Sequence, residues 1–478
     1  MSKQFEKKDW QDSMRVRFDF NNMMTSYVGE SGINESEIAD MELQIEKAEK
    51  AMKEKRANGG MDWRELPYNQ TEVVKDINEY VNSVKDEFET FVVLGIGGSA
   101  LGPIAVQQAI NHPYYNELSK EKRGGYPKLY VMDNIDPEKL VSLFDIVDLE
   151  TTLFNVITKS GSTSETMSQF MIIKEILEEK LGEKAKKHIV CTTDAKNGNL
   201  RPIADKEGYK SFIIPAGVGG RFSELTPVGL LPAAMCGIDI EQLLAGAAYM
   251  DELCKTDNTF KNPASMYAIL NYLGMKKGKN ISVVMPYTDS LKYIGDWYAQ
   301  LWAESLGKKY DNEGKVVNVG QTPVRALGAT DQHSQVQLYA EGPKDKVIVF
   351  VGVNNYKTSL TIPNIYSDIP SLGFLGGATH NKLIQTEQMA TEYALLKAGQ
   401  SNMTITLPEV NEFTLGQLLY LFEVATGFAG ELLNINAFDQ PGVEEGKNAT
   451  YAMFGRPGYE EKKEELDKRP EKNDKYII

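Results

Sequence analysis

Short, almost continuously apolar runs alternate with helix-like segments through most of this chain, and this alternation constrains its fold more than any other feature. Strands that are buried on both faces read as such runs, and strands that alternate with helices form a parallel, doubly wound sheet. The sequence therefore predicts an α/β protein with two α/β domains in tandem. The first set of runs is FVVLGI (91–96), KLYVMD (128–133), LFNVIT (153–158), HIVCTT (188–193) and SFIIP (211–215), and the second is ISVVMP (281–286), KVIVFVGV (346–353) and MTITLP (403–408).

The regions outside these two sets are polar and helix-like. Residues 1–75 are predicted to form an N-terminal helical region, because apolar residues recur at helical intervals in the charged run 36–57. We place the first α/β domain at 76–245, the second at 246–435, and a C-terminal helical segment at 436–478. The last twenty residues are highly charged and are expected to form a solvated helix or extension.

The composition excludes several classes of function. With 67 acidic and 52 basic residues the net charge is −15, which does not suit a general nucleic-acid binder, because phosphate backbones need a positive surface. Cys191, Cys236 and Cys254 lie far apart without CxxC spacing, which argues against a disulfide framework and a zinc site. No signal-peptide pattern is present, and no run approaches the roughly 20 apolar residues of a membrane span. These features predict a protein of a reducing, cytoplasmic compartment.

The first predicted strand leads into a glycine-rich loop, Gly95 to Gly102. Glycine lets the backbone approach a ligand closely, and the following helix would direct free N–H groups at an anion. The G-x-G-x-x-A order is also compatible with a dinucleotide site, but the acidic residue that such a site needs should follow after about 20 positions. Asp133 comes 31 residues after Gly102. A sugar or phosphate contact is therefore favoured over a nicotinamide site and over a purely structural turn.

A second loop, residues 158–166 (TKSGSTSET), follows another predicted buried strand and is rich in hydroxyl groups. Hydroxyls and unpaired N–H groups at the start of a helix form a compact cradle for an anion. A single serine or threonine would be enough to cap the helix, so the surplus of hydroxyls favours phosphate binding. The Walker order G-x-x-x-x-G-K-[ST] is absent, and ATP is not implied.

Two further segments complete a resemblance to a known family. The sequences GGRFS (219–223) and FDQPGVEEGK (438–447) are similar to the two signatures of the glucose-6-phosphate isomerase family, and the chain resembles that family from about residue 90 to about residue 458. The resemblance implies two sugar-isomerase (SIS-type) α/β/α domains, with parallel-rich sheets, in a homodimer. It also implies that the sugar phosphate is bound by Thr158, Lys159, Ser160 and Thr163, and that Gly98 and Ser99 of the first loop bind the substrate.

One helix-like segment carries a candidate catalytic base. In residues 289–309, Trp297, Gln300, Leu301 and Glu304 fall on one helical face, which puts a carboxylate on an apolar stripe. Burial raises the pKa of a carboxylate toward that of a useful base, although a buried glutamate held in an ion pair would give the same pattern. The resemblance favours the base, because Gln-x-x-x-Glu-Ser matches the family, and it assigns Gln300 to the substrate pocket.

His333, in the stretch Asp331-Gln332-His333, resembles the histidine that opens the sugar ring in this family and that comes from the neighbouring subunit. The family often has Gly-Gln-His at this place, so the local contacts of His333 stay open. Without the resemblance, a lone histidine is more often structural. The other three histidines show no spacing typical of metal ligands.

Two basic residues lie in the signature segments. Arg221 follows two glycines that allow close approach, and its permanent charge suits the stabilisation of an enediolate oxygen; a structural salt bridge is the alternative. Lys447 could simply pair with Glu444 at i,i+3. The resemblance instead assigns the matching lysine to ring opening, and it puts Gln440 and Gly220 in the substrate pocket.

These residues together predict reversible aldose–ketose isomerisation of glucose 6-phosphate to fructose 6-phosphate, a step of glycolysis and gluconeogenesis. The proton would move through a cis-enediolate, with Glu304, His333, Lys447 and Arg221 as catalytic residues and without a metal or an organic cofactor. Three alternatives remain: a non-catalytic sugar-phosphate sensor, an isomerase of mannose or amino-sugar phosphates, and a nicotinamide-dependent dehydrogenase.

Overall fold

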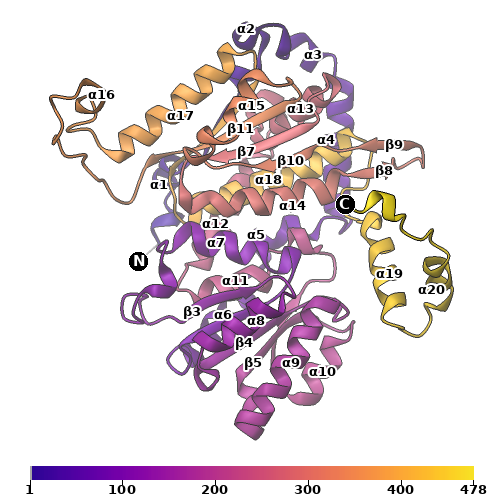
Figure 1. Ribbon diagram of the computed structural model, residues 1–478. Helices are drawn as coiled ribbons and strands as arrows, with labels where there is room; N and C mark the ends of the chain where they lie inside the picture. The colour runs from indigo at the N-terminus through magenta and orange to yellow at the C-terminus, as the bar shows by residue number, and fades with distance from the viewer. Residues whose placement is uncertain (1–2) are drawn as a thin grey trace.

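The computed structural model describes residues 3–478 and contains two five-stranded sheets, one above the other in Figure 1. The first sheet, in the lower half of the figure, has the strand order β3-β2-β4-β5-β6, and every neighbouring pair is parallel. Strands β2, β4 and β5 are buried at every position, which explains their continuously apolar sequences. The strands are β2 (Thr90–Leu94), β3 (Lys128–Met132), β4 (Thr152–Ile157), β5 (Ile189–Asp194) and β6 (Lys210–Ile214).

Helices connect the strands of the first sheet, as parallel pairing requires. They cover both faces, so that apolar side chains form clusters on each side of the strands. The connecting helices are α7 (Leu101–Ile110), α8 (Pro137–Ile146), α9 (Ser164–Leu181) and α10 (Leu200–Glu207), and α6 (Thr71–Val84) and α11 (Pro227–Met235) come before the first and after the last strand.

The second sheet has the order β1-β12-β11-β7-β10. Its pairs are parallel except that β1, from the N-terminal region, runs antiparallel to β12. Every run that the sequence analysis predicted as a strand is a strand, and the prediction of an α/β fold with parallel-rich sheets is confirmed. The strands are β1 (Arg17–Asp19), β7 (Ile281–Pro286), β10 (Thr322–Arg325), β11 (Lys346–Asn355) and β12 (Asn402–Glu409), and a separate antiparallel pair is formed by β8 (Lys308–Tyr310) and β9 (Val316–Val319).

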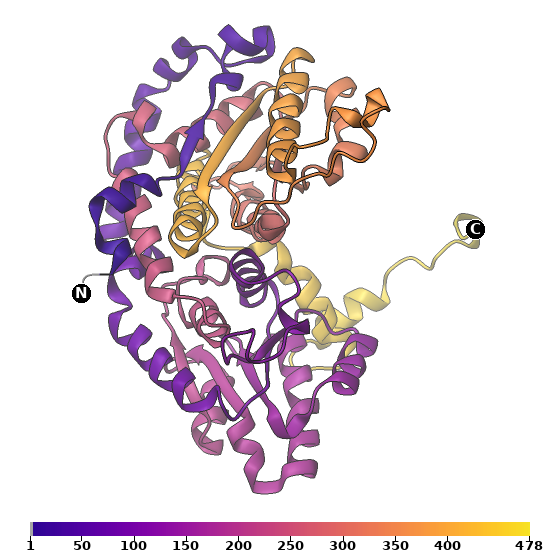
Figure 2. The same cartoon turned by 90° about the vertical axis from the view of Figure 1, so that its left-hand side faces the viewer.

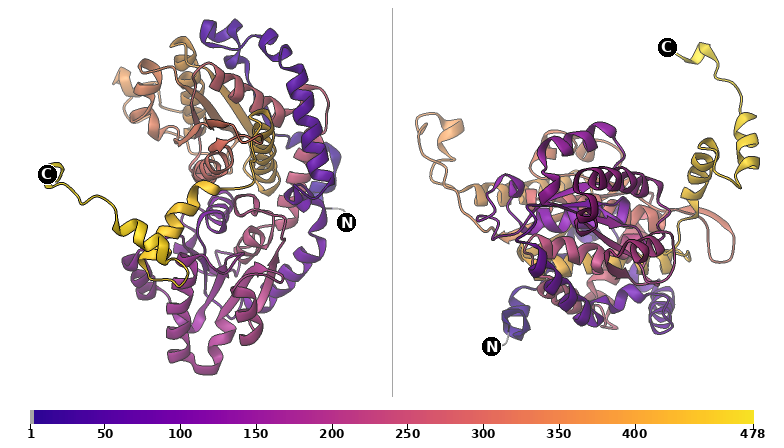
Figure 3. Two further views of the ribbon diagram at one scale, coloured as in Figure 1. Left: turned by 90° about the vertical axis from the view of Figure 1, so that its right-hand side faces the viewer. Right: turned by 90° about the horizontal axis from the view of Figure 1, so that it is seen from below.

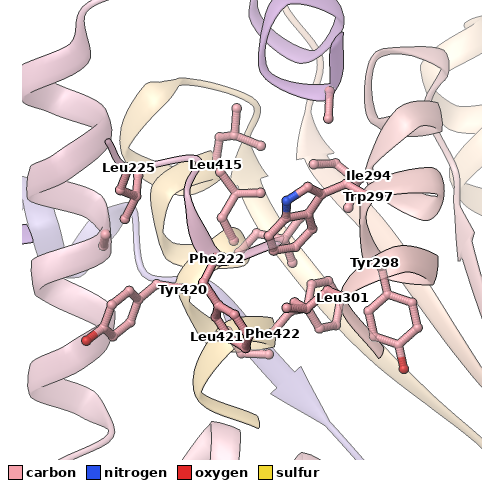
Figure 4. Packing of buried hydrophobic residues seen from close by; sticks show 14 of the residues in the cluster. Phe222, Leu225, Ile294, Trp297, Tyr298, Leu301, Leu415, Tyr420, Leu421 and Phe422 are labelled. Carbon is pink, nitrogen blue, oxygen red and sulfur yellow. The ribbon is translucent and has the colours of Figure 1, made fainter. Parts of the chain in front are cut away.

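The helix α18 (Glu412–Leu432) is the centre of the molecule. It is buried along almost its whole length and packs against α12, α13 and α14. Figure 4 shows Tyr420, Leu421 and Phe422 of α18 close to Phe222 and to side chains of α14. The other helices of this half are α12 (Ile240–Leu253), α13 (Pro263–Lys276), α14 (Lys292–Leu306), α15 (Val336–Glu341), α16 (Pro370–Gly373) and α17 (His380–Lys397).

The N-terminal region lies along the outside of both sheets, as Figure 2 shows for the indigo segment. Sequence analysis predicted only helices there, and the structure adds the strand β1, which is too short to give a periodic signal. The domain limits at residues 75, 245 and 435 stay a prediction. The helices are α1 (Lys8–Ser13), α2 (Thr25–Val28), α3 (Glu35–Ala39), α4 (Glu42–Ala57) and α5 (Leu66–Asn69).

Two segments project from the body. The first is the arm 356–379, which carries α16 and exposes several apolar side chains, including those of Leu360, Ile365 and Phe374. The second is the C-terminal segment with α19 (Glu444–Met453) and α20 (Glu460–Asp467), whose last residues extend into solvent in Figure 3. Within residues 3–478, no helix has the length and apolar character needed to cross a membrane.

Candidate functional site

A cavity of about 920 Å³ lies where the first sheet, α14 and the C-terminal segment meet. The carboxyl ends of β2, β4 and β5 point toward this cavity. Ligands bind at this edge in open parallel sheets. Every residue that the sequence analysis proposed for the site lines this cavity, except His333. These residues are Gly98, Ser99, Thr158, Lys159, Ser160, Thr163, Gly220, Arg221, Gln300, Glu304, Gln440 and Lys447.

The hydroxyl-rich loop connects β4 to α9 and forms one wall of the cavity. Thr163 stands at the position that caps α9, but no side chain within residues 3–478 caps this helix. The hydroxyl of Thr163 is instead 3.1 Å from that of Thr158, and the hydroxyl of Ser160 accepts from the N–H of Ser162 at 3.2 Å. The first N–H groups of α9 thus remain free to bind an anion in the cavity.

Lys159 lies in the same loop but points toward the segment that precedes Arg221. Its Nζ donates to the carbonyl oxygens of Ala216 and Val218, at 2.5 and 2.9 Å. Burial lowers the pKa of Lys159, against the opposing charges of Asp194 and Asp62. The ammonium group therefore connects the hydroxyl-rich loop to the segment before Arg221 and brings positive charge to this side of the cavity.

The glycine-rich loop after β2 packs directly on the loop of Arg221. A Cβ on Gly98 would collide with the carbonyl oxygen of Gly220, and one on Gly97, whose φ is +58°, would lie 2.9 Å from Nε2 of Gln300. The glycines are thus required by close approach of backbone to backbone and to the α14 side chain. This packing holds the two loops at a defined separation on the cavity wall.

Arg221 is almost fully buried in the short helix Gly220–Phe222 and is held by several acceptors. Its Nε donates to Oγ of Ser305 at 2.7 Å, its Nη1 donates to Oε1 of Gln440 at 3.0 Å, and its Nη2 donates to the carbonyl oxygens of Ala437 and Asp439 at 2.5 and 3.1 Å. These bonds use every N–H of the guanidinium except one on Nη1. Burial lowers the pKa of Arg221, and the charges of Glu304 and Asp439 oppose this effect.

Glu304 stands in the last turn of α14 and faces the cavity. Its Oε2 accepts from Nε2 of Gln300 at 3.1 Å and lies 3.8 Å from Nη1 of Arg221, the atom with the uncommitted N–H. The side chain is 27% exposed. Glu304 is therefore neither a core residue nor a carboxylate in a close ion pair, and it can meet a ligand in the cavity.

Lys447 lies on α19 and borders the cavity from the C-terminal segment. Its Nζ donates to Oε1 of Glu444 at 2.8 Å, so the i,i+3 pair that sequence analysis weighed as an alternative is present. The side chain is 48% exposed, and an exposed pair of this kind is weak. The ammonium group can therefore leave Glu444 for a ligand at little cost.

His333 is the predicted site residue that does not line the cavity. It is exposed at the end of the short helix Thr330–His333, which follows β10 of the second sheet. Its neighbours are anchored: Asp331 accepts from the N–H of Leu327 at 2.7 Å, and Oε1 of Gln332 accepts from the hydroxyl of Tyr287 at 2.7 Å. The turn is therefore well defined, and it presents the imidazole outward.

Trp63 and Asp194 are among the cavity residues that sequence reasoning missed. Trp63, from the N-terminal region, stacks on Phe222 with ring centroids 4.9 Å apart, and it had no local signal. Its neighbour Arg64 donates a hydrogen bond to the buried Asp251. Burial raises the pKa of Asp251, but Arg64 and the other partners of Asp251 lower this pKa to about 2. Asp194 could have been found, because it directly follows the predicted strand 188–193, at the same edge of the sheet as the other two loops.

The carboxylate of Asp194 accepts hydrogen bonds from the turn that follows β5. The N–H groups of Lys196 and Asn197 donate to its Oδ1 at 2.9 and 2.8 Å, and these bonds lower the pKa of Asp194. The carboxylate thus orders the turn after β5, whose Asn199 N–H donates to the carbonyl of Ser160 at 2.8 Å. The turn after β5 is therefore hydrogen-bonded to the loop after β4 beside the cavity.

Comparison with known proteins gives a consistent result. The family described as phosphoglucose isomerase matches residues 69–469. A glucose-6-phosphate isomerase of Carboxydothermus hydrogenoformans is 52% identical over 453 residues, which are 95% of this chain and 97% of that protein. One of Rubrobacter xylanophilus is 46% identical over 386 residues, or 80% and 86% of the two chains.

Solved structures agree in fold. A hypothetical protein from Thermus thermophilus superposes with a TM-score of 0.83 at 36% identity, covering 92% of this chain and 100% of that chain. A glucose-6-phosphate isomerase from Chlamydia trachomatis superposes with a TM-score of 0.71 at 24% identity, covering 83% and 76%.

Proposed function

Because this chain belongs to the phosphoglucose isomerase family, we propose which of its own residues carry out the reaction of that family. The reaction is the reversible isomerisation of glucose 6-phosphate to fructose 6-phosphate, a step of glycolysis and gluconeogenesis. One observation carries the assignment. A partly exposed carboxylate, an immobilised guanidinium with one free N–H, and a hydroxyl-rich helix N-terminus face the same cavity.

The phosphate group of the sugar binds at the N-terminus of α9, with Ser160 and Thr163 as hydroxyl donors and Lys159 as a nearby charge. The uncapped N–H groups of α9 support this assignment, since a dianion there meets both donors and the positive end of the helix dipole. Gly98 and Ser99, in the loop after the neighbouring strand β2, also line the cavity. This binding fixes one end of the substrate and leaves C1 and C2 to face α14.

Glu304 moves the proton. In the open-chain aldose it removes the proton from C2 and returns it to C1, while the hydroxyl proton on O2 is lost and O1 gains one. The intermediate is a cis-enediolate, whose negative charge the remaining N–H of Arg221 stabilises. Gln300 supports this role, because its amide donates to the carboxylate and holds its orientation. Gln440, hydrogen-bonded to Arg221, and Gly220 complete the pocket.

Lys447 and His333 open the sugar ring, the lysine from α19 of the same subunit and the histidine from the other subunit of a homodimer. The exposed position of His333, outside the cavity of its own chain, supports a role in trans. The exposed apolar side chains of the arm 356–379 support an assembly as well, because such a projecting surface is typical of a subunit contact. A cytoplasmic location is proposed from the three unpaired cysteines.

The first test is the activity of the purified chain. We expect fructose 6-phosphate to form from glucose 6-phosphate in a coupled assay, at the same rate before and after treatment with EDTA, because the proposed chemistry uses only side chains. Mannose 6-phosphate and glucosamine 6-phosphate, assayed in parallel, should be turned over much more slowly. Binding of glucose 6-phosphate without any turnover would instead identify a sensor, and a rate lost with EDTA would contradict the side-chain mechanism.

The role of His333 in trans can be tested with hybrid dimers. His333→Ala and Glu304→Gln subunits should each be nearly inactive as homodimers. In a hybrid that is purified with two different tags, one of the two sites combines an intact Glu304 with an intact His333, so about half of the wild-type activity should return. If His333 served its own subunit, every site of the hybrid would carry a defect and the hybrid would stay inactive.

A further inference from the structure

The last turn of α14 is held by a residue to which neither the reaction nor the family resemblance assigned a role. The helix ends at Leu306, so the carbonyl oxygens of its last turn have no partner within the helix. Nζ of Lys308 donates to two of them, those of Glu304 and Ser305, both at 2.8 Å. One of these carbonyls thus belongs to the proposed catalytic base itself.

Lys308 is buried, although it does not line the cavity. Its side chain is 5% exposed, and its Nζ lies 3.7 Å from Oδ1 of Asp439. Asp439 in turn accepts, through its carbonyl oxygen, a hydrogen bond from Nη2 of Arg221 at 3.1 Å. The ammonium group therefore connects the turn of the base to the segment that immobilises Arg221.

Burying the charge of Lys308 carries a desolvation cost. Burial lowers the pKa of Lys308, the charge of Arg221 lowers it further, and Asp439 and Glu304 oppose both effects. A helix end can be closed without burying a charge by a glycine in the left-handed conformation, and a buried charge is weak evidence for stability. The position of Lys308 therefore needs an explanation other than stability.

We propose that Lys308 is a positioning residue, which holds the last turn of α14 against the segment 437–440 so that Glu304 and Arg221 keep one fixed relation. The proposal rests on the roles assigned above to Glu304 and Arg221. Without Lys308, two carbonyls of the last turn lose their donor and Asp439 loses its cation. The turn of Glu304 then moves independently of Arg221, and the base and the oxyanion donor are no longer aligned.

This role predicts a specific kinetic pattern. A displacement of about 1 Å at the reacting groups can lower turnover by about 10²-fold. The hydroxyl-rich loop 158–166 lies on the first sheet, and the polar partners of Lys308 are Glu304, Ser305 and Asp439, so substrate binding should persist. Lys308→Met, which keeps the length of the side chain without its donors, should therefore lower kcat by about 10²-fold and leave KM for fructose 6-phosphate almost unchanged.

The test compares three variants by steady-state kinetics and by the affinity for two ligands. Lys308→Arg, which retains charge and donors, should recover much of the lost kcat. Lys309→Met is the matched control: the exposed neighbour in the same strand should keep wild-type kinetics. In Lys308→Met, a five-carbon sugar-acid phosphate that mimics the enediolate should bind more weakly, whereas a hexitol 6-phosphate should bind as in the wild type.

The proposal is overturned if Lys308→Met keeps the wild-type kcat, if KM and kcat change together by the same factor, or if Lys309→Met shows the same defect. If Lys308→Met does not fold, Lys308→Gln takes its place with the same expected pattern. The Glu304→Gln variant separates this proposal from the function itself. An inactive Glu304→Gln beside a normal Lys308→Met rejects only the positioning role, whereas an active Glu304→Gln rejects the assigned base.

Discussion

Replacing Glu304 by glutamine is expected to lower kcat by about 10²- to 10⁴-fold, the range that a positioned acid–base group contributes. The amide has nearly the shape of the carboxylate and can still accept the hydrogen bond from Gln300, so the site should keep its geometry. It cannot take a proton from carbon. KM and the affinity for the sugar-acid phosphate mimic should change little, because the proposed phosphate site is the loop 158–166 and not α14.

Two measurements check this result. Steady-state kinetics give kcat and KM, and proton exchange between the substrate and D₂O, followed by NMR, reports the proton transfer directly and should disappear. Asp296→Asn is the matched control, because Asp296 is on the same helix, pairs with Arg325 and does not line the cavity. This control should retain turnover. Near-normal exchange in Glu304→Gln would mean that another group is the base.

Arg221→Lys should lower kcat by about 10²- to 10³-fold, as expected when a donor to a developing oxyanion is removed. Lysine keeps the charge but cannot reproduce the planar fork that reaches Ser305, Gln440 and two carbonyl oxygens at once. Some of these buried acceptors then lack a donor. We therefore also expect the free energy of unfolding to fall by about 1–3 kcal/mol.

The two effects can be separated by measuring kinetics and urea unfolding on the same preparations. Arg201→Lys is a suitable control, since Arg201 is also largely buried and binds Asp205 and Ser211 but lies outside the cavity. It should cost stability without a loss of turnover. An Arg221→Lys protein that is folded under assay conditions and isomerises its substrate at the wild-type rate would show that the guanidinium does not stabilise the transition state.

Some features of the site could be predicted from the sequence because they depend only on residues that are neighbours along the chain. A parallel strand buried on both faces is mostly apolar, so β2, β4 and β5 were visible as runs, and the loops at their ends followed. The surplus of hydroxyls before α9 indicated a role beyond capping, and the structure has an uncapped helix there. Trp297 and Leu301 on the predicted face of α14 are buried, whereas Glu304 on the same face is 27% exposed, because it borders the cavity.

Other features have no local signal. The strand β1 is three residues long and forms only because β12 offers its edge. Trp63 reaches the cavity because Arg64 is anchored to Asp251, which lies on α12, far along the chain. The contact of Lys308 with the carbonyl of Glu304 spans only four residues, yet its importance depends on Asp439, which a distant segment supplies.

The sequence by itself determined the α/β class, the long buried strands, the position of the two loops and the family, because hydrophobic periodicity, glycine and hydroxyl chemistry act over a few neighbouring residues. Only the tertiary structure decided that Glu304, Arg221, Gln440 and Lys447 line one cavity while His333 faces outward from its own chain. It also decided that Arg221 retains a single free N–H. Such properties depend on which distant segments pack together, and packing is settled by the whole core rather than by any one stretch of chain.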